Sequence, residues 1–192
     1  MTKLAIACCL LVATTAHADD ASRWRLSAES DPSTFALGGF SAWLAAKPAG
    51  THHVRVGAGA FGIDFPSFVV PYLNRSGEDG WDLRVRAAMG FAAYQLGDRR
   101  GLYIGAYSGF LQAHHTRTDM PGVADRDVIT VLPAIGYQWF PFDRGALAGA
   151  YVEPWAGATV WFPVAGSSTV GTHTFKDPYV IPLAAVHVGY EW

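Results

Sequence analysis

The sequence predicts an all-β fold, an eight-stranded antiparallel up-and-down transmembrane β-barrel, on three observations. The chain is 51% hydrophobic and only 16% charged, whereas water-soluble domains average about 25% charged residues. Its apolar residues alternate with small or polar ones at a period of two, which is typical of strands whose two faces meet different surroundings. After residue 18 we find no run of about 18 apolar residues, so we expect no membrane-spanning helix.

Residues 1–18 are predicted to be a secretory signal peptide. Lys3 supplies the positive charge, an apolar stretch follows, and Ala16-His17-Ala18 has the small-x-small pattern of a cleavage site. Both cysteines lie in this segment, so the mature chain has no disulfide or thiolate metal site. We interpret 19–192 as one outer-membrane barrel domain that is exported through the periplasm.

The first four strand candidates are separated by clear turn signals. Residues 22–30 end at the sequence DPST, and 35–46 end at KPAG, where proline and glycine interrupt a strand. Residues 51–65 lead into a polar, turn-rich stretch. The fourth candidate, 81–96, alternates most clearly. Trp81, Leu83, Val85, Ala87, Met89, Phe91 and Ala93 share one face, and Asp82, Arg84, Arg86, Ala88, Gly90 and Ala92 share the other.

The last four candidates continue the pattern. GDRR at 97–100 turns the chain into 101–114, and a loop leads to 128–140. PFDRG at 141–145 turns it into 146–162, and a final loop precedes 178–192. The connections after the second, fourth and sixth strands are short. Those after the third, fifth and seventh (66–80, 115–127 and 163–177) are long.

Short connections on one side and long loops on the other are typical of bacterial outer-membrane barrels, as are aromatic residues near strand ends. The sheet has to close, because an open edge in hydrocarbon leaves backbone groups without hydrogen bonds. The aromatic residues expected in the two girdles are Trp24, Trp43, Trp81, Tyr137, Trp139, Trp161, Phe162, Tyr179, Tyr190 and Trp192.

The final strand carries the most specific signal. Val186, Val188, Tyr190 and Trp192 alternate up to the C-terminus. With the strand count, this resembles the small eight-stranded outer-membrane barrels of the OmpA, OmpX and OmpW type. The resemblance implies a Gram-negative envelope, outer-membrane lipid around the wall, and an assembly machinery that reads these four residues. The alternative is a secreted β-sandwich, although the Ala, Gly and Val on the apolar faces are small for a sandwich core.

An eight-stranded barrel has an interior just wide enough for its own side chains, so an open pore is not expected. The residues predicted to form a lumen charge network are Arg55, Arg84, Arg86, Glu153, His187 and Glu191. Opposite charges in so confined a space have to pair, and we expect Glu153 to pair with Arg84 or Arg86. The favoured interpretation is a structural plug, and the alternative is a gate or a proton-linked switch.

Three prolines, Pro133, Pro154 and Pro182, fall on the sixth, seventh and eighth strands. Proline cannot donate a hydrogen bond to a neighbouring strand. These prolines therefore predict either local bulges or a lateral opening in the wall. The second interpretation resembles the lipid A palmitoyltransferase barrel, in which strand prolines mark lateral access.

Metal and nucleic-acid sites are not predicted. His52-His53 and His114-His115 fall at opposite rims, about 25 Å apart on a barrel of this type. The remaining metal candidate, in the loops, is His173 with His114 or His115 and Asp119 or Asp125. With 14 Lys and Arg against 16 Asp and Glu, the chain has no concentrated basic surface for nucleic acid.

No catalytic residue or cofactor is predicted either. His187-Val188-Gly189 lacks the serine of the His-x-Ser motif that the lipid A deacylase barrel carries. We see no phosphate-binding glycine loop and no nucleophile elbow. The sequence thus favours a non-enzymatic integral outer-membrane barrel with a side-chain-filled lumen, whose outer loops contact a surface, ligand or partner. The alternative is a barrel that modifies lipid or transfers a small apolar ligand. The oligomeric state stays open.

Overall fold

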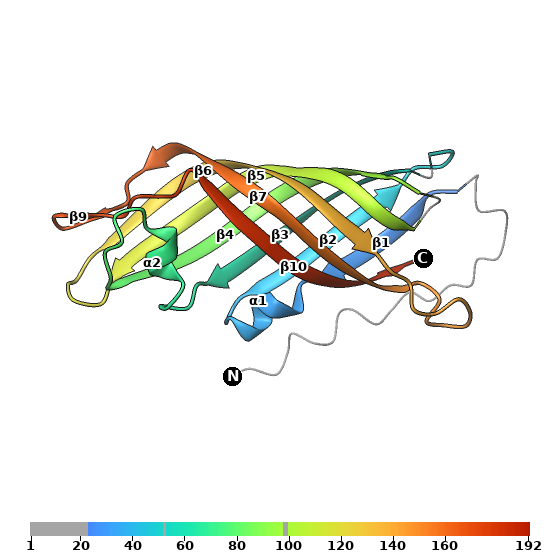
Figure 1. Cartoon of the computed structure of the whole chain (residues 1–192), viewed down its shortest axis with the longest axis horizontal. Coiled ribbons are helices and arrows are strands. Elements are labelled where there is room, and N and C mark those ends of the chain that lie inside the picture. The colour runs from blue at the N-terminus through green and yellow to red at the C-terminus, as the bar shows by residue number, and fades with distance from the viewer. Residues whose placement is uncertain (1–22, 52, 98–99) are drawn as a thin grey trace.

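In this computed structural model the chain is a closed antiparallel β-barrel (Figure 1). The structure describes residues 23–51, 53–97 and 100–192, so the predicted signal peptide and His52 lie outside the described residues. Eight strands in these ranges hydrogen-bond in the order β1-β10-β7-β6-β5-β4-β3-β2, and the first strand pairs with the last. The predicted fold class is confirmed.

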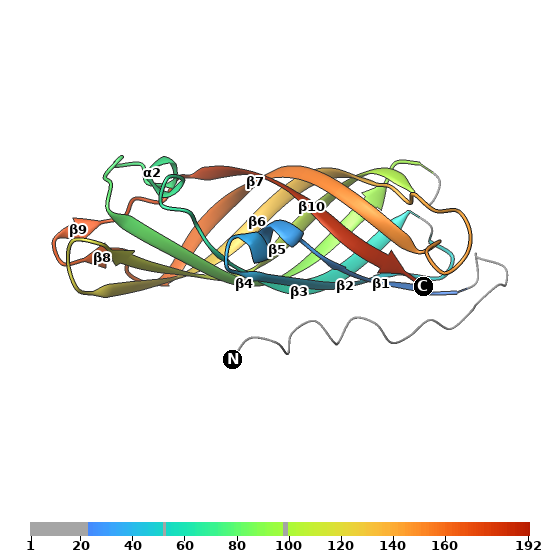
Figure 2. The same cartoon turned by 90° about the horizontal axis from the view of Figure 1, so that it is seen from below.

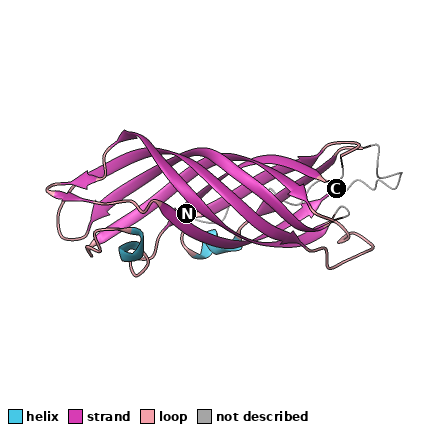
Figure 3. Ribbon diagram, turned by 45° about the horizontal axis from the view of Figure 1, so that its top comes forward, coloured by secondary structure: helices cyan, strands magenta, loops and turns pink. Residues whose placement is uncertain are grey.

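The elements match the expected series with a few additions. The wall strands are β1 (Arg25–Ser30), β2 (Phe40–Lys47), β3 (Val54–Asp64), β4 (Trp81–Gln95), β5 (Gly101–Arg117), β6 (Val123–Gln138), β7 (Ala150–Gly166) and β10 (Val180–Glu191). The additions are α1 (Pro32–Ala36), α2 (Val70–Leu73) and a small hairpin of β8 (Thr169–Val170) and β9 (His173–Thr174). Figure 3 shows the two short helices in cyan against the magenta wall.

Two connections differ from the expected lengths. The connection between β5 and β6 spans only 118–122, because both strands continue outward through most of the predicted loop 115–127. The connection between β6 and β7 spans 139–149, which is longer than the predicted turn. The alternation of apolar and polar residues does not show where a strand ends when the strand continues past the apolar part of the wall.

The strands are strongly tilted. When the register is followed once around the barrel from Val180, it returns to β10 at Tyr190, ten residues further along the same strand. This stagger corresponds to a strand tilt of about 40°. We call the end that holds Arg25 and Glu191 the terminus end, and the end that holds α2 and the β8–β9 hairpin the loop end.

The wall is incomplete on one side. β1 pairs with β10 only from Ser30 opposite Val188 to Ser27 opposite Glu191. Residues 180–187 of β10 therefore extend about 26 Å beyond the end of β1 along the strand direction, at about 3.3 Å per residue. α1 contacts β10, β2 and β3. Figure 2 shows it against the wall, part-way along the barrel. We call this break in the wall the notch.

The outer face is apolar. Exposed aromatic residues surround the terminus end: Trp24, Tyr94, Tyr137, Trp139 and Trp192. Further along the wall, exposed aliphatic residues include Leu44, Ile104, Ile135 and Val188. Three of the girdle residues expected from the sequence instead point inward: Trp43 and Trp81 are buried, and Trp161 is half-buried against the core. Neither helix in the described part of the chain has the length and apolar character needed to cross a membrane.

Candidate functional site

The barrel interior is filled in layers, and its central layer is a charge network around Arg55. One guanidinium nitrogen of Arg55 lies 2.6 Å from the Glu153 carboxylate. The other donates to Glu29, and it also donates to the Tyr151 hydroxyl at 3.1 Å. All four side chains are buried, and Glu153 is fully so. One guanidinium thus lies between two carboxylates from β1 and β7.

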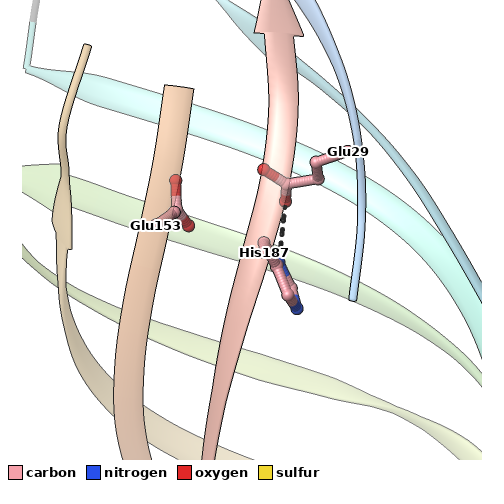
Figure 4. Close-up of side chains that lie close together, drawn as sticks. All are labelled: Glu29, Glu153 and His187. Atoms are coloured by element: carbon pink, nitrogen blue, oxygen red, sulfur yellow. Dashed lines mark hydrogen bonds and ion pairs between the residues drawn. The ribbon is translucent and has the colours of Figure 1, made fainter. Parts of the chain in front are cut away.

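His187 joins this network from β10. Figure 4 shows His187 in contact with Glu29. The distance from His187 Nδ1 to Glu29 Oε1 is 3.4 Å, and His187 Nε2 accepts a hydrogen bond from Trp155 Nε1 at 3.1 Å. Glu29, Glu153 and His187 each have a potential ligand atom within 4.8 Å of the others. That spacing would suit a metal ion, but Arg55 already lies against both carboxylates. Tyr103 also donates to Glu153, and Tyr151 to Glu29. The group therefore fits an ion-pair network better than a metal site.

A second polar layer lies nearer the terminus end. Glu191 accepts from Lys47 at 2.9 Å and from Arg25 at 3.2 Å. Lys47 also donates to Gln138, which accepts a further hydrogen bond from Gln95. These polar side chains close the terminus end of the lumen.

The structure corrects the predicted role of Arg84 and Arg86. Both lie on the outer face of β4, where alternate residues are exposed, and neither pairs with Glu153. Arg84 instead makes an exposed ion pair with Asp64 at 2.6 Å. Near the loop end the outer face of β4 is polar, while its inner face carries apolar residues such as Val85 and Met89. The polar face of this strand therefore faces outward. Arg55, Glu153, His187 and Glu191 lie inside.

Above the Arg55 network, four rings form an aromatic layer. Trp43 lies 6.0 Å from His187 and 5.7 Å from Tyr107 between ring centroids. Tyr107 stacks on Trp155 at 5.8 Å. Gly59 allows Trp43 to lie flat on β3, because a Cβ there would come within 2.4 Å of the indole ring. This aromatic layer separates the charged side chains on its terminus-end side from an empty space on its loop-end side.

That space is a cavity of about 270 Å³ in the half of the lumen toward the loop end. Its volume is close to the lower limit of typical small-molecule pockets, about 300–1,000 Å³. The walls are mainly apolar and come from every wall strand except β1: Trp43, Phe61, Ile63, Val85, Met89, Tyr107, Leu111, Leu132, Trp155, Trp161, Ile181 and Leu183. The expected side-chain-filled lumen is thus realised in only part of the barrel.

The β8–β9 hairpin closes the loop end above this cavity. Phe175 is buried, with its ring 5.5 Å from Trp81 and 4.8 Å from His115. Asp177 follows it and pairs with Arg126 of β6. Burial raises the pKa of the Asp177 carboxyl, and the nearby Arg126 opposes that shift. The cavity is therefore covered at both ends of the barrel.

The cavity reaches the outside through the notch. Its lining includes Ser33 and Ala184, which are exposed, and Leu37, which is half-buried. Ser33 and Leu37 belong to the α1 segment, and Ala184 lies on the part of β10 that β1 does not reach. We call this passage between α1 and β10 the mouth.

The three prolines lie near the mouth to different degrees. Pro182 is on the part of β10 that borders the notch, opposite Ala158. Pro154 pairs with Val186 within a continuous ladder. At Pro133 the pairing of β6 with β7 is interrupted between Val131 and Ala134. The opening of the cavity therefore lies between β10 and α1. It was not predicted from the sequence, because no helix was expected between the first two strands, and α1 ends β1 early.

The other predicted residues are dispersed. Val186 and Val188 are exposed on the outer face of β10, and Tyr190 stacks on Trp192, which is exposed directly after the end of β10. His114 pairs with Asp125 at the surface, while His173 lies 3.4 Å from Glu78. His115 is buried beneath the hairpin. The predicted loop metal ligands do not gather into one group among the described residues.

Comparisons with known proteins add little beyond the fold. No protein-family model matches the sequence, and no curated protein matches it either. Among solved structures, the crystal structure of the N-terminal beta-barrel domain of Pseudomonas aeruginosa OprF matches with a TM-score of 0.45 and 10% sequence identity. The match covers 88% of this chain and 96% of that chain.

Proposed function

We propose that this chain is an integral outer-membrane barrel that takes one aliphatic chain from the surrounding bilayer into its lumen through the mouth. The observation that carries the proposal is an apolar cavity that is covered at both ends of the barrel and reaches the exterior at the side. An interior site covered in this way receives a ligand from lipid more readily than from water.

The surroundings of the mouth support this route. Phe35 on α1, Phe40 on β2 and Val186 on β10 are exposed apolar side chains around the notch. Apolar side chains facing outward at this height suit contact with acyl chains. Irregular backbone in a membrane is tolerated only where it is buried in protein or lines a cavity, and α1 lines this cavity. With its shorter connections toward the periplasm, the barrel would open to the outer leaflet.

The size of the cavity indicates what enters. About 270 Å³ holds a single chain or a small apolar molecule rather than a whole lipid. The Arg55 network and the terminus-end layer close the route to the periplasm, so the barrel acts as a binding protein rather than an open pore. A non-enzymatic role and contact with the assembly machinery through Val186, Val188, Tyr190 and Trp192 complete the proposal.

Tryptophan fluorescence tests the proposal directly. Trp43, Trp155 and Trp161 line the cavity, and brominated acyl chains quench an indole that they touch. In a background with Trp24, Trp139 and Trp192 changed to Phe, a brominated fatty-acid methyl ester should quench the interior rings saturably. Heat-modifiability on a gel would confirm that this background is folded.

A matched pair of variants tests the mouth. Ala184 and Ala156 are exposed and directly opposite each other on β10 and β7, but only Ala184 lines the cavity. Ala184→Phe should weaken binding about tenfold, because exclusion of roughly two methylene groups costs about 1.6 kcal/mol. Ala156→Phe should leave binding unchanged. Equal effects of the two variants, or no saturable quenching at all, would refute the proposal.

A further inference from the structure

Hydroxyl groups interrupt the apolar lining of the cavity. Thr130 on β6 and Thr159 on β7 both line it and are only 2% and 4% exposed. Their Oγ1 atoms lie 2.5 Å apart, and either atom can be the donor. A pair of hydroxyls carries two protons, but only one of them lies between the two oxygens.

The second proton of this threonine pair has no acceptor among the described residues. In that part of the chain, each of the two hydroxyls hydrogen-bonds only to the other. A buried polar hydrogen without a partner costs free energy. The pair therefore presents an unused O–H donor to an otherwise apolar space.

Ser41 repeats this situation on β2. Its hydroxyl oxygen accepts from the Trp43 indole nitrogen at 3.0 Å and from the backbone N–H of Asp31 at 3.2 Å. Ser41 lines the cavity and is 4% exposed, and its own hydroxyl proton has no acceptor among the described side chains and backbone groups. Both ring nitrogens of His187, in contrast, already have partners.

The cavity thus offers hydroxyl donors and lacks a free cationic side chain in its lining, where the charged member is Asp31. A ligand that complements it has an aliphatic chain and an uncharged oxygen that accepts hydrogen bonds. A plain alkane would leave the donors unused, and a free carboxylate would meet no counter-charge there. We infer that the ligand is an ester-linked acyl chain whose carbonyl oxygen accepts from the Thr130–Thr159 pair. This inference rests on the proposed function, and it specifies the substrate class of the same cavity.

The test compares two probes of equal chain length, a brominated fatty-acid methyl ester and a brominated alkane. Thr130→Val with Thr159→Val removes both hydroxyls at nearly constant volume. One neutral hydrogen bond corresponds to roughly three- to tenfold in affinity. The double variant should therefore lose about that factor for the ester while its affinity for the alkane stays within about twofold.

A second threonine pair supplies the control. Thr169 and Thr174 on the β8–β9 hairpin have their hydroxyls 2.9 Å apart, but they are exposed and do not line the cavity. Thr169→Val with Thr174→Val should leave the affinities for both probes unchanged. Ser41→Ala is less suitable, because it would also leave two N–H donors without an acceptor.

The outcomes separate the inference from the proposed function. Loss of affinity for the ester alone in the Thr130/Thr159 variant supports the inference. If the wild-type chain and this variant have the same ratio of ester to alkane affinity, the carbonyl contact is wrong, although chain binding stands. If neither probe quenches the interior rings, both the inference and the proposed function fail.

Discussion

At the scale of single residues, Arg55 and Arg84 show how the position of an arginine decides how much its charge contributes to stability. Arg55 is 3% exposed and contacts two buried carboxylates. Arg84 has a side chain 50% exposed and pairs with one exposed carboxylate. Removal of one partner from a buried ion pair is strongly destabilising, whereas an exposed pair contributes little.

Arg55→Met should therefore destabilise the barrel by roughly 3–5 kcal/mol, since it leaves Glu29 and Glu153 buried without a counter-charge. The measurement is the urea dependence of unfolding in detergent micelles. Arg84→Met is the matched control and should cost less than about 1 kcal/mol. Equal losses in the two variants would contradict the assignment of the interior network.

Glu153→Gln should have a smaller effect than Arg55→Met, because Arg55 keeps Glu29 as its counter-ion. We expect a loss of about 1–3 kcal/mol from the hydrogen bonds to Arg55 and Tyr103. The same unfolding assay measures it. A loss as large as that of Arg55→Met would show that both carboxylates are needed to hold the guanidinium.

Gly59→Ala should disturb the floor of the cavity. Its new Cβ would lie 2.4 Å from the Trp43 ring and 2.5 Å from the carbonyl oxygen of Ala42, so the indole has to move. We expect a shift in tryptophan emission and at least about a fourfold loss of ester binding, the equivalent of one methylene group. Gly90→Ala on β4 meets only ordinary contact, at 3.6 Å, and should change neither quantity.

At the scale of elements, the break between β1 and β2 creates the site. Asp31 caps α1 by accepting from the Ser33 backbone N–H at 2.9 Å and from its hydroxyl at 2.7 Å. With Pro32 at the first helical position, this local sequence starts a helical turn where a longer β1 would otherwise continue along β10. α1 therefore lines the mouth in place of paired strand.

Asp31→Ala should loosen α1 without unfolding the barrel. Loss of an N-cap costs about 1 kcal/mol, which corresponds to roughly fivefold faster local hydrogen exchange. Exchange of the amides at 33–39, followed by mass spectrometry, measures the effect. Ser33→Ala keeps the backbone bond to Asp31 and should change exchange less. An effect that spreads to β5 and β6 would mean that α1 stabilises the whole wall.

At the scale of the whole molecule, the barrel combines an apolar outer wall with charged, aromatic and hollow layers inside. Four residue pairs join β1 to β10, and Leu26 and Trp192 exchange two further backbone hydrogen bonds, against sixteen pairs between β5 and β6. Both seams of β1, with the C-terminal strand and with β2, are therefore short in comparison with the rest of the wall.

If the wall faces lipid, the purified chain should need detergent to stay dispersed, and it should shift in gel mobility after boiling. In intact cells, a protease site inserted at 75–79 should be cleaved, whereas one inserted at 143–146 should be protected until the outer membrane is opened. Cleavage at 143–146 in intact cells would reverse the proposed orientation.

The sequence alone determined that the chain is a barrel, because period-two alternation, turn spacing and composition are local properties. They can be recognised without knowing which strands are neighbours. It also indicated that Arg55, Glu153, His187 and Glu191 face inward. It could not decide which face of β4 is inside, since both a polar face above the membrane and a polar lumen give the same alternation. Only the tertiary structure decided that Arg55 is the partner of Glu153, that α1 interrupts the wall, and that a cavity remains above the aromatic layer. Pairing, notch and cavity depend on the register around the closed ring, which brings residues more than a hundred positions apart to the same height.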